Sequence, residues 1–344
     1  MRKLVLFIIL LIPFNVSAYG SAYIVMDTDN NRVLEGNNIH APHLVASTSK
    51  IMTALVVLNN IDVNQEVVIN SEVLKSYGSG IYVEVGEQIS VLDLFYGLML
   101  RSGNDAAIAL ANEVGGSMAG FVTLMNETAQ SIGMKNTNYL NSHGLEEAKK
   151  GNTSSAYDMA LLSSFAMQNE IFRKITSTRK HIVKTNYKTY LWHNKNKLML
   201  NYEYCTGGKT GFTELARRTL VTTASKNNVN LTIVTFKDGD DFNDHETLYN
   251  KYFSQLKKYP ILKKGDIVTK QKNTFINDDF AMSLTEKEYQ NIKININYYE
   301  QNVTNILGEV MVSLYGKVYF KTPIYLKEYE PRLTFWQKLK NLLS

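Results

Sequence analysis

Cysteine is almost absent from this sequence: Cys205 is the only one in 344 residues. A single thiol excludes any disulfide within the chain, so we expect the fold to depend on its packed apolar core, which a chain of this size can build. No partner pattern accompanies the thiol. We therefore predict that Cys205 is a small apolar side chain in the core and not a reactive group.

Two other features are missing: an excess of one charge and a metal-binding spacing. The chain has 37 basic and 32 acidic residues, a net charge of +5. Such a nearly balanced surface gains little from counterion release, which argues against a nucleic-acid partner. The six histidines show no His-Glu-x-x-His spacing, so we expect no metal site.

The N-terminus has an apolar run that is too short to span a bilayer comfortably, which takes about 20 residues. Arg2 and Lys3 precede the apolar residues 4–14, and small residues at 16 and 18 suit a cleavage site. We predict a secretory signal peptide over 1–18, with an uncleaved anchor as the alternative. The protein is then exported to the extracytoplasmic side of the cell membrane, in the cell wall or the periplasmic space.

The body of the chain has β-like segments at both ends of a helical block. Apolar and β-branched residues predict strands at 22–27, 32–35, 181–183, 190–192, 219–223 and 231–236. Apolar periodicity predicts helices at 51–58, 92–99, 106–113, 119–132, 156–167 and 242–256. This order suits an α+β domain in which the first and last strands join one sheet and the helices pack on it.

The pattern of apolar residues changes toward the C-terminus. Short β-like segments at 267–269, 292–296, 310–312 and 318–320 are separated by Gly or Asn, which predicts a small β domain. The last segment, 331–344, has three basic and no acidic residues, and its large apolar side chains share one helical stripe. Such a basic amphipathic helix either lies in a membrane interface or docks on the protein.

A serine and a lysine three residues apart, Ser47 and Lys50, precede the apolar run 51–58. About one helical turn separates them, so Lys50 Nζ can reach Ser47 Oγ. A serine is a weak nucleophile until a neighbour takes its proton, and a lysine does so only if burial or a second cation lowers its pKa. The same spacing at 177–180 and 254–257 lacks a following buried run. Ser47 is therefore the predicted nucleophile and Lys50 its base.

Two further motifs follow in order: Ser102-Gly103-Asn104, 55 residues after Ser47, and Lys209-Thr210-Gly211, 107 residues later. This order resembles the penicillin-interacting serine acyltransferases, which include penicillin-binding proteins and serine β-lactamases. The sequence around these motifs resembles the D-alanyl-D-alanine carboxypeptidases, which are the low-molecular-weight penicillin-binding proteins. Their sporulation-associated branch is one option. The stretches that carry this resemblance are 46–55, 102–106, 143–145, 156–160 and 208–213.

The resemblance implies an exported serine D-Ala-D-Ala carboxypeptidase that removes the last D-alanine of peptidoglycan stem peptides and is acylated by penicillin and other β-lactam antibiotics. It implies no cofactor. The expected fold is a β-lactamase/DD-peptidase-like antiparallel sheet flanked by helices, followed by a small all-β domain. The predicted organisation is a signal peptide (1–18), a catalytic domain (19–258), a β domain (259–330) and a candidate membrane anchor (331–344).

Roles carried over from the family fit the residue chemistry. Ser47 attacks the penultimate D-alanine carbonyl, Lys50 takes the serine proton, and Ser102 relays a proton to the departing amine. Asn104 binds the substrate backbone or holds Lys50. Lys209 adds a second positive charge that disfavours the protonated form of Lys50.

The remaining predicted residues bind substrate. Thr210 and Thr213 offer hydroxyls to its terminal carboxylate, and Gly211 lets its backbone lie close to the strand. The backbone N–H groups of Ser47 and Phe212 form the oxyanion hole by position in the family. The side chain of Phe212 should therefore matter little.

One stretch departs from the family pattern. Many members place an arginine near the substrate carboxylate in the helix after the last core strand, where this chain has His245. The substrate carboxylate is then expected to bind Lys209 and the two threonines, or else Arg217 or Arg218. We expect His143 to be structural, because no Gly-x-Ser-x-Gly elbow is present and Lys50 already supplies a base.

Two other functions stay open at this point. A β-lactamase would use the same acylation but needs fast deacylation. A penicillin-binding or wall-binding protein with a silent site is the non-enzymatic alternative, although every chemical residue is present.

Overall fold

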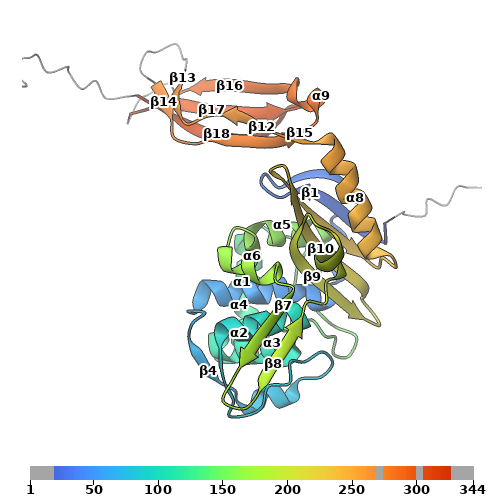
Figure 1. Cartoon of the computed structure of the whole chain (residues 1–344). Coiled ribbons are helices and arrows are strands. Elements are labelled where there is room, and N and C mark those ends of the chain that lie inside the picture. Colours follow the sequence, from blue (N-terminus) through green and yellow to red (C-terminus); the bar gives the residue numbers. More distant parts are fainter. Residues whose placement is uncertain (1–18, 268–273, 300–304, 327–344) are drawn as a thin grey trace, which may run out of the picture. The chain divides into compact units, whose positions relative to one another are not determined.

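The computed structural model describes residues 19–267, 274–299 and 305–326 (Figure 1). The predicted signal peptide and the C-terminal segment 331–344 lie outside these residues. The described chain divides into two compact units. The first has residues 19–226 and 230–251, and we call it the catalytic unit after the predicted catalytic domain; the second, the β unit, has residues 227–229 and the described residues from 252 to 326. The predicted domain boundaries stay predictions.

A five-stranded sheet organises the catalytic unit, with the strand order β2-β1-β11-β10-β9. Its strands are β1 (Ala22–Asp27), β2 (Arg32–Asn37), β9 (Cys205–Thr213), β10 (Arg217–Lys226) and β11 (Val229–Phe236). The first strand pairs antiparallel with β11, with Ala22 opposite Phe236. The N-terminal hairpin therefore joins the C-terminal strands of the sheet, as the sequence predicts.

Helices cover the sheet and fill the space beside β9. They are α1 (Lys50–Asn60), α2 (Val91–Tyr96), α3 (Asn104–Gly115), α4 (Met118–Ser131), α5 (Ala156–Ala166), α6 (Glu170–Thr176), α7 (Lys197–Asn201) and α8 (Asp241–Gln255). Two of them, α6 and α7, were not predicted, because seven and five residues are too few to show a clear period. Asparagine side chains at Asn169 and Asn196 cap their N-termini.

Short elements complete the unit. The two-stranded pairs are β3 (His43–Leu44) with β6 (Thr153–Ser154), β4 (Glu66–Val68) with β5 (Gln88–Ser90), and β7 (Lys180–Lys184) with β8 (Thr189–His193). Two short 3-10 helices are η1 (Ala46–Ser49) and η2 (Ser71–Lys75), and η3 (Gly97–Arg101) is a π-helical turn that follows α2. Within the described ranges no individual helix has the length and hydrophobicity to cross a membrane; the α3 and α4 pair meets those limits only jointly and bends by 84°.

The β unit has a five-stranded sheet in the order β13-β14-β18-β17-β16 and the pair β12-β15. Its elements are β12 (Lys257–Leu262), β13 (Gly265–Ile267), β14 (Thr274–Ile276), β15 (Phe280–Leu284), α9 (Glu286–Tyr289), β16 (Ile292–Tyr298), β17 (Ile306–Leu314) and β18 (Lys317–Leu326). Buried side chains such as Met282 and Val312 form its core. The prediction of a small β domain is confirmed, with one short helix added.

Candidate active site

The predicted nucleophile lies in η1, at the entrance to α1. Ala46 adopts a left-handed backbone with φ of 47°, which turns the chain sharply before Ser47. The carbonyl of Val45 accepts hydrogen bonds from Thr48 Oγ1 at 2.6 Å and from Thr219 Oγ1 of β10 at 3.0 Å. These bonds fix the turn against the sheet, so Ser47 has a defined position.

Lys50 is fully buried in the first turn of α1. Its Nζ lies 3.1 Å from Ser47 Oγ, 2.7 Å from Asn104 Oδ1 and 2.5 Å from the backbone oxygen of His143. Burial, and next the charge of Lys209, lower the pKa of Lys50 well below its usual value. A neutral amine has two N–H groups, which suit Asn104 and His143, and one lone pair, which is then left for the Ser47 hydroxyl.

Ser102 and Lys209 form a second serine and lysine pair. Ser102 has φ of 63° between η3 and α3, and its Oγ accepts a hydrogen bond from Lys209 Nζ at 3.0 Å. Lys209 also donates to the Thr210 carbonyl at 2.7 Å. Burial, and next the charge of Lys195, lower the pKa of Lys209 to about 7. The two buried amines are thus each held at a serine.

The first turn of α3 links Lys50 to the neighbouring loop. Asn104 accepts from Lys50 and donates through Nδ2 to the Tyr77 carbonyl at 2.6 Å. The next side chain, Asp105, accepts from the backbone N–H groups of Ile81 and Tyr82 at 3.0 and 2.6 Å. The sequence analysis missed Asp105, although an acidic residue at a helix N-terminus is a recognisable signal.

Gly211 brings β9 against the nucleophile. A Cβ at this position would lie 2.4 Å from Thr219 Oγ1 and 3.0 Å from the backbone nitrogen of Ser47. The glycine is therefore required by packing of the strand on η1. Its predicted role, making room for the substrate backbone, stays a prediction. The contact also brings β9 beside the Ser47 N–H, where an oxyanion hole with Phe212 was predicted.

A cavity of about 360 Å³ opens beside these groups. Five residues from the predicted motif stretches line it: Ser47, Ser102, Thr210, Gly211 and Phe212. The other lining residues are Ser79, Lys195, Lys197, Asp241, Phe242 and Arg218, which the sequence analysis named as one alternative for the substrate carboxylate. Three of the side chains in this second set are cationic and one is acidic, so the cavity suits an anionic group on the substrate. Sequence reasoning missed the two lysines, because no motif surrounds them.

Arg218 is held in a fixed orientation at the cavity. Its guanidinium forms two hydrogen bonds with the buried carboxylate of Asp241 and lies 5.4 Å from the centre of the Phe242 ring. About 42% of the Arg218 side chain stays exposed. Burial raises the pKa of Asp241, and the neighbouring arginine opposes that shift.

His245 lies away from the cavity, in the core between α8 and the sheet. Its ring nitrogens lie 2.7 Å from Thr222 Oγ1 and 3.1 Å from Thr235 Oγ1. Burial lowers the pKa of His245 to about 3, so the imidazole is neutral at pH 7. The residue at the family's arginine position therefore does not replace that arginine in this chain.

Thr213 and His143 have contacts that the sequence did not predict. The hydroxyl of Thr213 donates to Glu146 at 2.5 Å and accepts from the Ala216 N–H at 3.0 Å. Thr213 is not among the residues that line the cavity in the described part of the chain, so its predicted role gains no support. His143 contributes its carbonyl to Lys50, a role that leaves no mark in a sequence.

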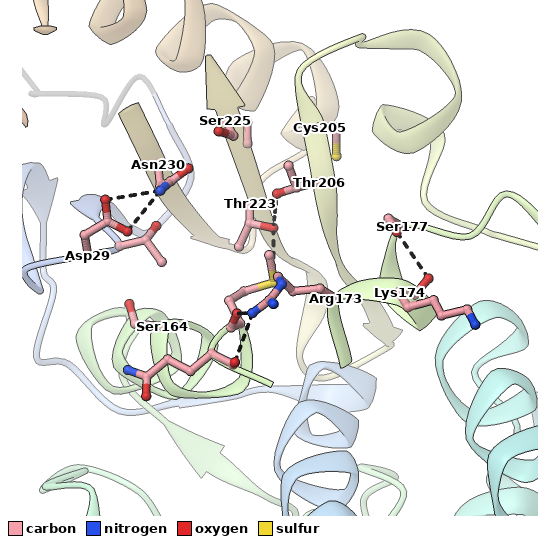
Figure 2. A pocket seen from close by; sticks show the side chains of 14 residues that line it. Asp29, Ser164, Arg173, Lys174, Ser177, Cys205, Thr206, Thr223, Ser225 and Asn230 are labelled. Atoms are coloured by element: carbon pink, nitrogen blue, oxygen red, sulfur yellow. Dashed lines mark hydrogen bonds between the residues drawn. The ribbon is translucent and has the colours of Figure 1, made fainter. Parts of the chain in front are cut away.

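A larger cavity of about 740 Å³ lies elsewhere in the catalytic unit (Figure 2). Arg173 lies in it and donates to the carbonyls of Met167 and Gln168, which directly follow α5. Cys205 is buried in its wall, and burial raises the pKa of this thiol to about 12. The burial of Cys205 agrees with the predicted place of this side chain in the core, and its lack of reactivity stays a prediction. None of the predicted site residues lines this cavity.

Comparisons with known proteins identify relatives of this chain. The family model for D-alanyl-D-alanine carboxypeptidase matches residues 13–240. D-alanyl-D-alanine carboxypeptidase DacF of Bacillus subtilis (strain 168) is 32% identical over 258 residues, which cover 72% of this chain and 66% of that protein. D-alanyl-D-alanine carboxypeptidase DacB2 of Mycobacterium tuberculosis is 33% identical over 214 residues, which cover 62% of this chain and 73% of that protein.

The fold is similar to solved structures over both units. Penicillin binding protein 5 from Haemophilus influenzae matches with a TM-score of 0.76 and 24% identity, covering 89% of this chain and 96% of that one. The family model spans the residues that bring Ser47, Lys50, Ser102 and Lys209 together. The expected family and fold are thereby confirmed, and this chain belongs to the D-alanyl-D-alanine carboxypeptidase family.

Proposed function

We propose that the protein removes the terminal D-alanine of peptidoglycan stem peptides through an acyl-enzyme on Ser47, on the extracytoplasmic side of the cell membrane. The observation that carries this proposal is the buried Lys50 amine, 3.1 Å from Ser47 Oγ and with two other acceptors for its N–H groups. A base that is neutral because it is desolvated can take the serine proton at pH 7.

In the proposed acylation, Ser47 Oγ bonds to the penultimate carbonyl carbon as Lys50 takes its proton. The backbone N–H groups of Ser47 and Phe212 stabilise the oxyanion, each by about 3 kcal/mol. The bond to the last D-alanine then breaks, and Ser102 relays a proton to the departing nitrogen. In this first step the Ser47 proton is transferred, in net terms, to the departing amine. In the second step water adds to the acyl carbon, and the Ser47 hydroxyl is restored.

We assign the substrate carboxylate to Thr210 and Arg218. Both line the cavity beside Ser47. Asp241 and Phe242 hold the guanidinium in one orientation while part of it stays exposed. Since His245 is buried and neutral, an arginine on β10 takes the place of the helix arginine found in many family members.

The direct test is intact mass after incubation with penicillin, followed by peptide mapping and by assay of D-alanine released from diacetyl-Lys-D-Ala-D-Ala. We expect one adduct on Ser47, release of D-alanine, and neither with Ser47→Ala. An adduct that survives Ser47→Ala would contradict the assignment. Faster turnover of a chromogenic cephalosporin than of the peptide would favour the β-lactamase alternative instead.

Attachment to the membrane is a separate proposal from the sequence. It depends on the basic amphipathic segment 331–344, which would give weak and reversible contact with an anionic bilayer surface. Loss of vesicle binding on removal of this segment, with carboxypeptidase activity retained, is the expected result.

A further inference from the structure

We propose that Glu146 is a positioning residue, which holds the end of β9 against the loop that fixes Lys50. This inference rests on the proposed function, because it concerns the rate of acylation at Ser47. Thr213 comes directly after Phe212, the residue assigned to the oxyanion hole. The Thr213 hydroxyl donates to Glu146 Oε1 at 2.5 Å and accepts from the Ala216 N–H at 3.0 Å, so a single hydroxyl closes the turn after β9 and joins it to Glu146.

The loop that carries Glu146 packs tightly on the nucleophile turn. Gly144 has φ of 90°, and a Cβ there would lie 2.0 Å from the carbonyl oxygen of Ala46. The Oδ1 of Asn141 accepts from the N–H groups of His143 and Gly144 at 3.2 and 2.6 Å, which holds the loop in this conformation. A shift of the loop would therefore disturb η1 directly.

The same loop contacts both Lys50 and β9, the strand that carries Phe212. His143 holds Lys50 through its carbonyl, and three residues later Glu146 holds Thr213. Among the described residues, the bond from Thr213 to Glu146 is the one side-chain hydrogen bond between the end of β9 and this loop, and it is lost without the Glu146 carboxylate. The Phe212 N–H would then be less well placed, while the base stays where it is. The charges that act on Lys50 come from Lys209, Asp105 and Lys195, so Glu146 should act through geometry and not through the base.

The experiment compares Glu146→Ala, Glu146→Gln and the matched control Glu147→Ala, whose side chain is exposed on the same loop. The readout is the rate constant for acylation of Ser47 by benzylpenicillin, measured as a function of pH. We expect Glu146→Ala to slow acylation about tenfold, the usual weight of a hydrogen bond to a charged group. Glu146→Gln keeps an acceptor oxygen and should stay within about twofold of the wild type.

A second pair tests the other end of the bond and covers the case in which Glu146→Ala fails to fold. Thr213→Val should slow acylation as Glu146→Ala does, Thr213→Ser should restore it, and the double variant should be no slower than either single one. The pH profile should keep its midpoint in every variant.

Several outcomes would overturn the proposal. Wild-type rates in Glu146→Ala or Thr213→Val, or equal losses in Glu146→Gln and Glu146→Ala, would exclude a role for this hydrogen bond. A shifted midpoint would show that Glu146 acts on the base by charge. Absence of any penicillin adduct on wild-type Ser47 would instead refute the proposed function, so the two failures are distinguishable.

Discussion

The catalytic unit and the β unit bury different kinds of side chain. Among the described residues of the β unit, the buried polar side chains are the neutral hydroxyls of Thr274, Ser283, Ser313 and Thr322. The catalytic unit buries full charges or titratable groups, with Lys50 at 0% and Lys209 at 1% exposure. Burying an amine in a core is costly unless the amine becomes neutral or finds partners.

This difference shows where the molecule tolerates an unfavourable burial. In the β unit, apolar residues such as Met282 and Val312 pack into a core that stabilises the unit. In the catalytic unit, the same desolvation that disfavours a charged amine makes Lys50 a base beside Ser47. The comparison therefore predicts that substitutions in the two units have separable effects, and four measurements test it.

The largest effect is expected from Lys50→Arg. A guanidinium stays charged in proteins and cannot take the serine proton, so acylation by penicillin should slow by at least about a thousandfold. Lys50→Met is the matched variant, with the base removed and no charge to bury. Both should show the same loss in rate by intact mass, whereas an acylation rate within about tenfold of the wild type in either would refute Lys50 as the base.

Arg218→Gln should have a smaller effect, confined to substrate binding. We expect KM for diacetyl-Lys-D-Ala-D-Ala to rise about tenfold with kcat nearly unchanged, because the guanidinium is assigned to the carboxylate and not to the reacting atoms. Asp241→Asn should raise KM less. Steady-state kinetics provide the test, and a fall in kcat without a change in KM would place Arg218 elsewhere in the mechanism.

A third measurement uses the pH dependence of stability. The pKa of Lys209 is about 7 in the folded protein and higher when the chain unfolds, so between these two values the unfolded state binds more protons. The free energy of unfolding should then rise as pH increases above 7. Below about pH 7 both states bind the proton, so the stability gained from the neutral Lys209 amine is absent there. Lys209→Met should flatten the rise in urea unfolding at pH 7, 8 and 9. An identical slope in both proteins would contradict the lowered pKa.

The smallest effect on activity is expected from Met282→Ala in the core of the β unit. Removing this buried side chain should lower the stability of the β unit by about 2–5 kcal/mol, seen as an earlier thermal or urea transition. The rate of Ser47 acylation at 25 °C should stay within about twofold, since the residues assigned to catalysis all lie in the catalytic unit. A loss of acylation as large as that of Lys50→Met would show that the two units do not act separately.

Much of the fold was predictable because helices and strands are indicated by local residue patterns, and the sheet by the order of these segments along the chain. The helix after Ser47 is marked by eight consecutive apolar or small residues, and β1 and β11 by β-branched runs at the two ends of the helical block. The short helices α6 and α7 escaped prediction for lack of length. In the site, the Ser47 and Lys50 pair was predictable from one helical turn.

Other parts of the site have no sequence signature. The carbonyl of His143 is a backbone group that every residue has, and Lys195 is one of many lysines until the fold brings it to the cavity. The sequence did not show that Gly211 also avoids a clash with η1, because that close approach exists only in the folded chain. Thr213 was expected to bind substrate, yet its hydroxyl contacts Glu146.

The sequence by itself determined the chemical groups, their order and the family, because residue type and spacing along a helix or strand are local properties. Only the tertiary structure decided which amines have a lowered pKa, which arginine lies at the cavity and which loop holds the base. Those properties depend on desolvation and on contacts between residues about 50 to 170 positions apart, such as Lys50 with Asn104 and Val45 with Thr219.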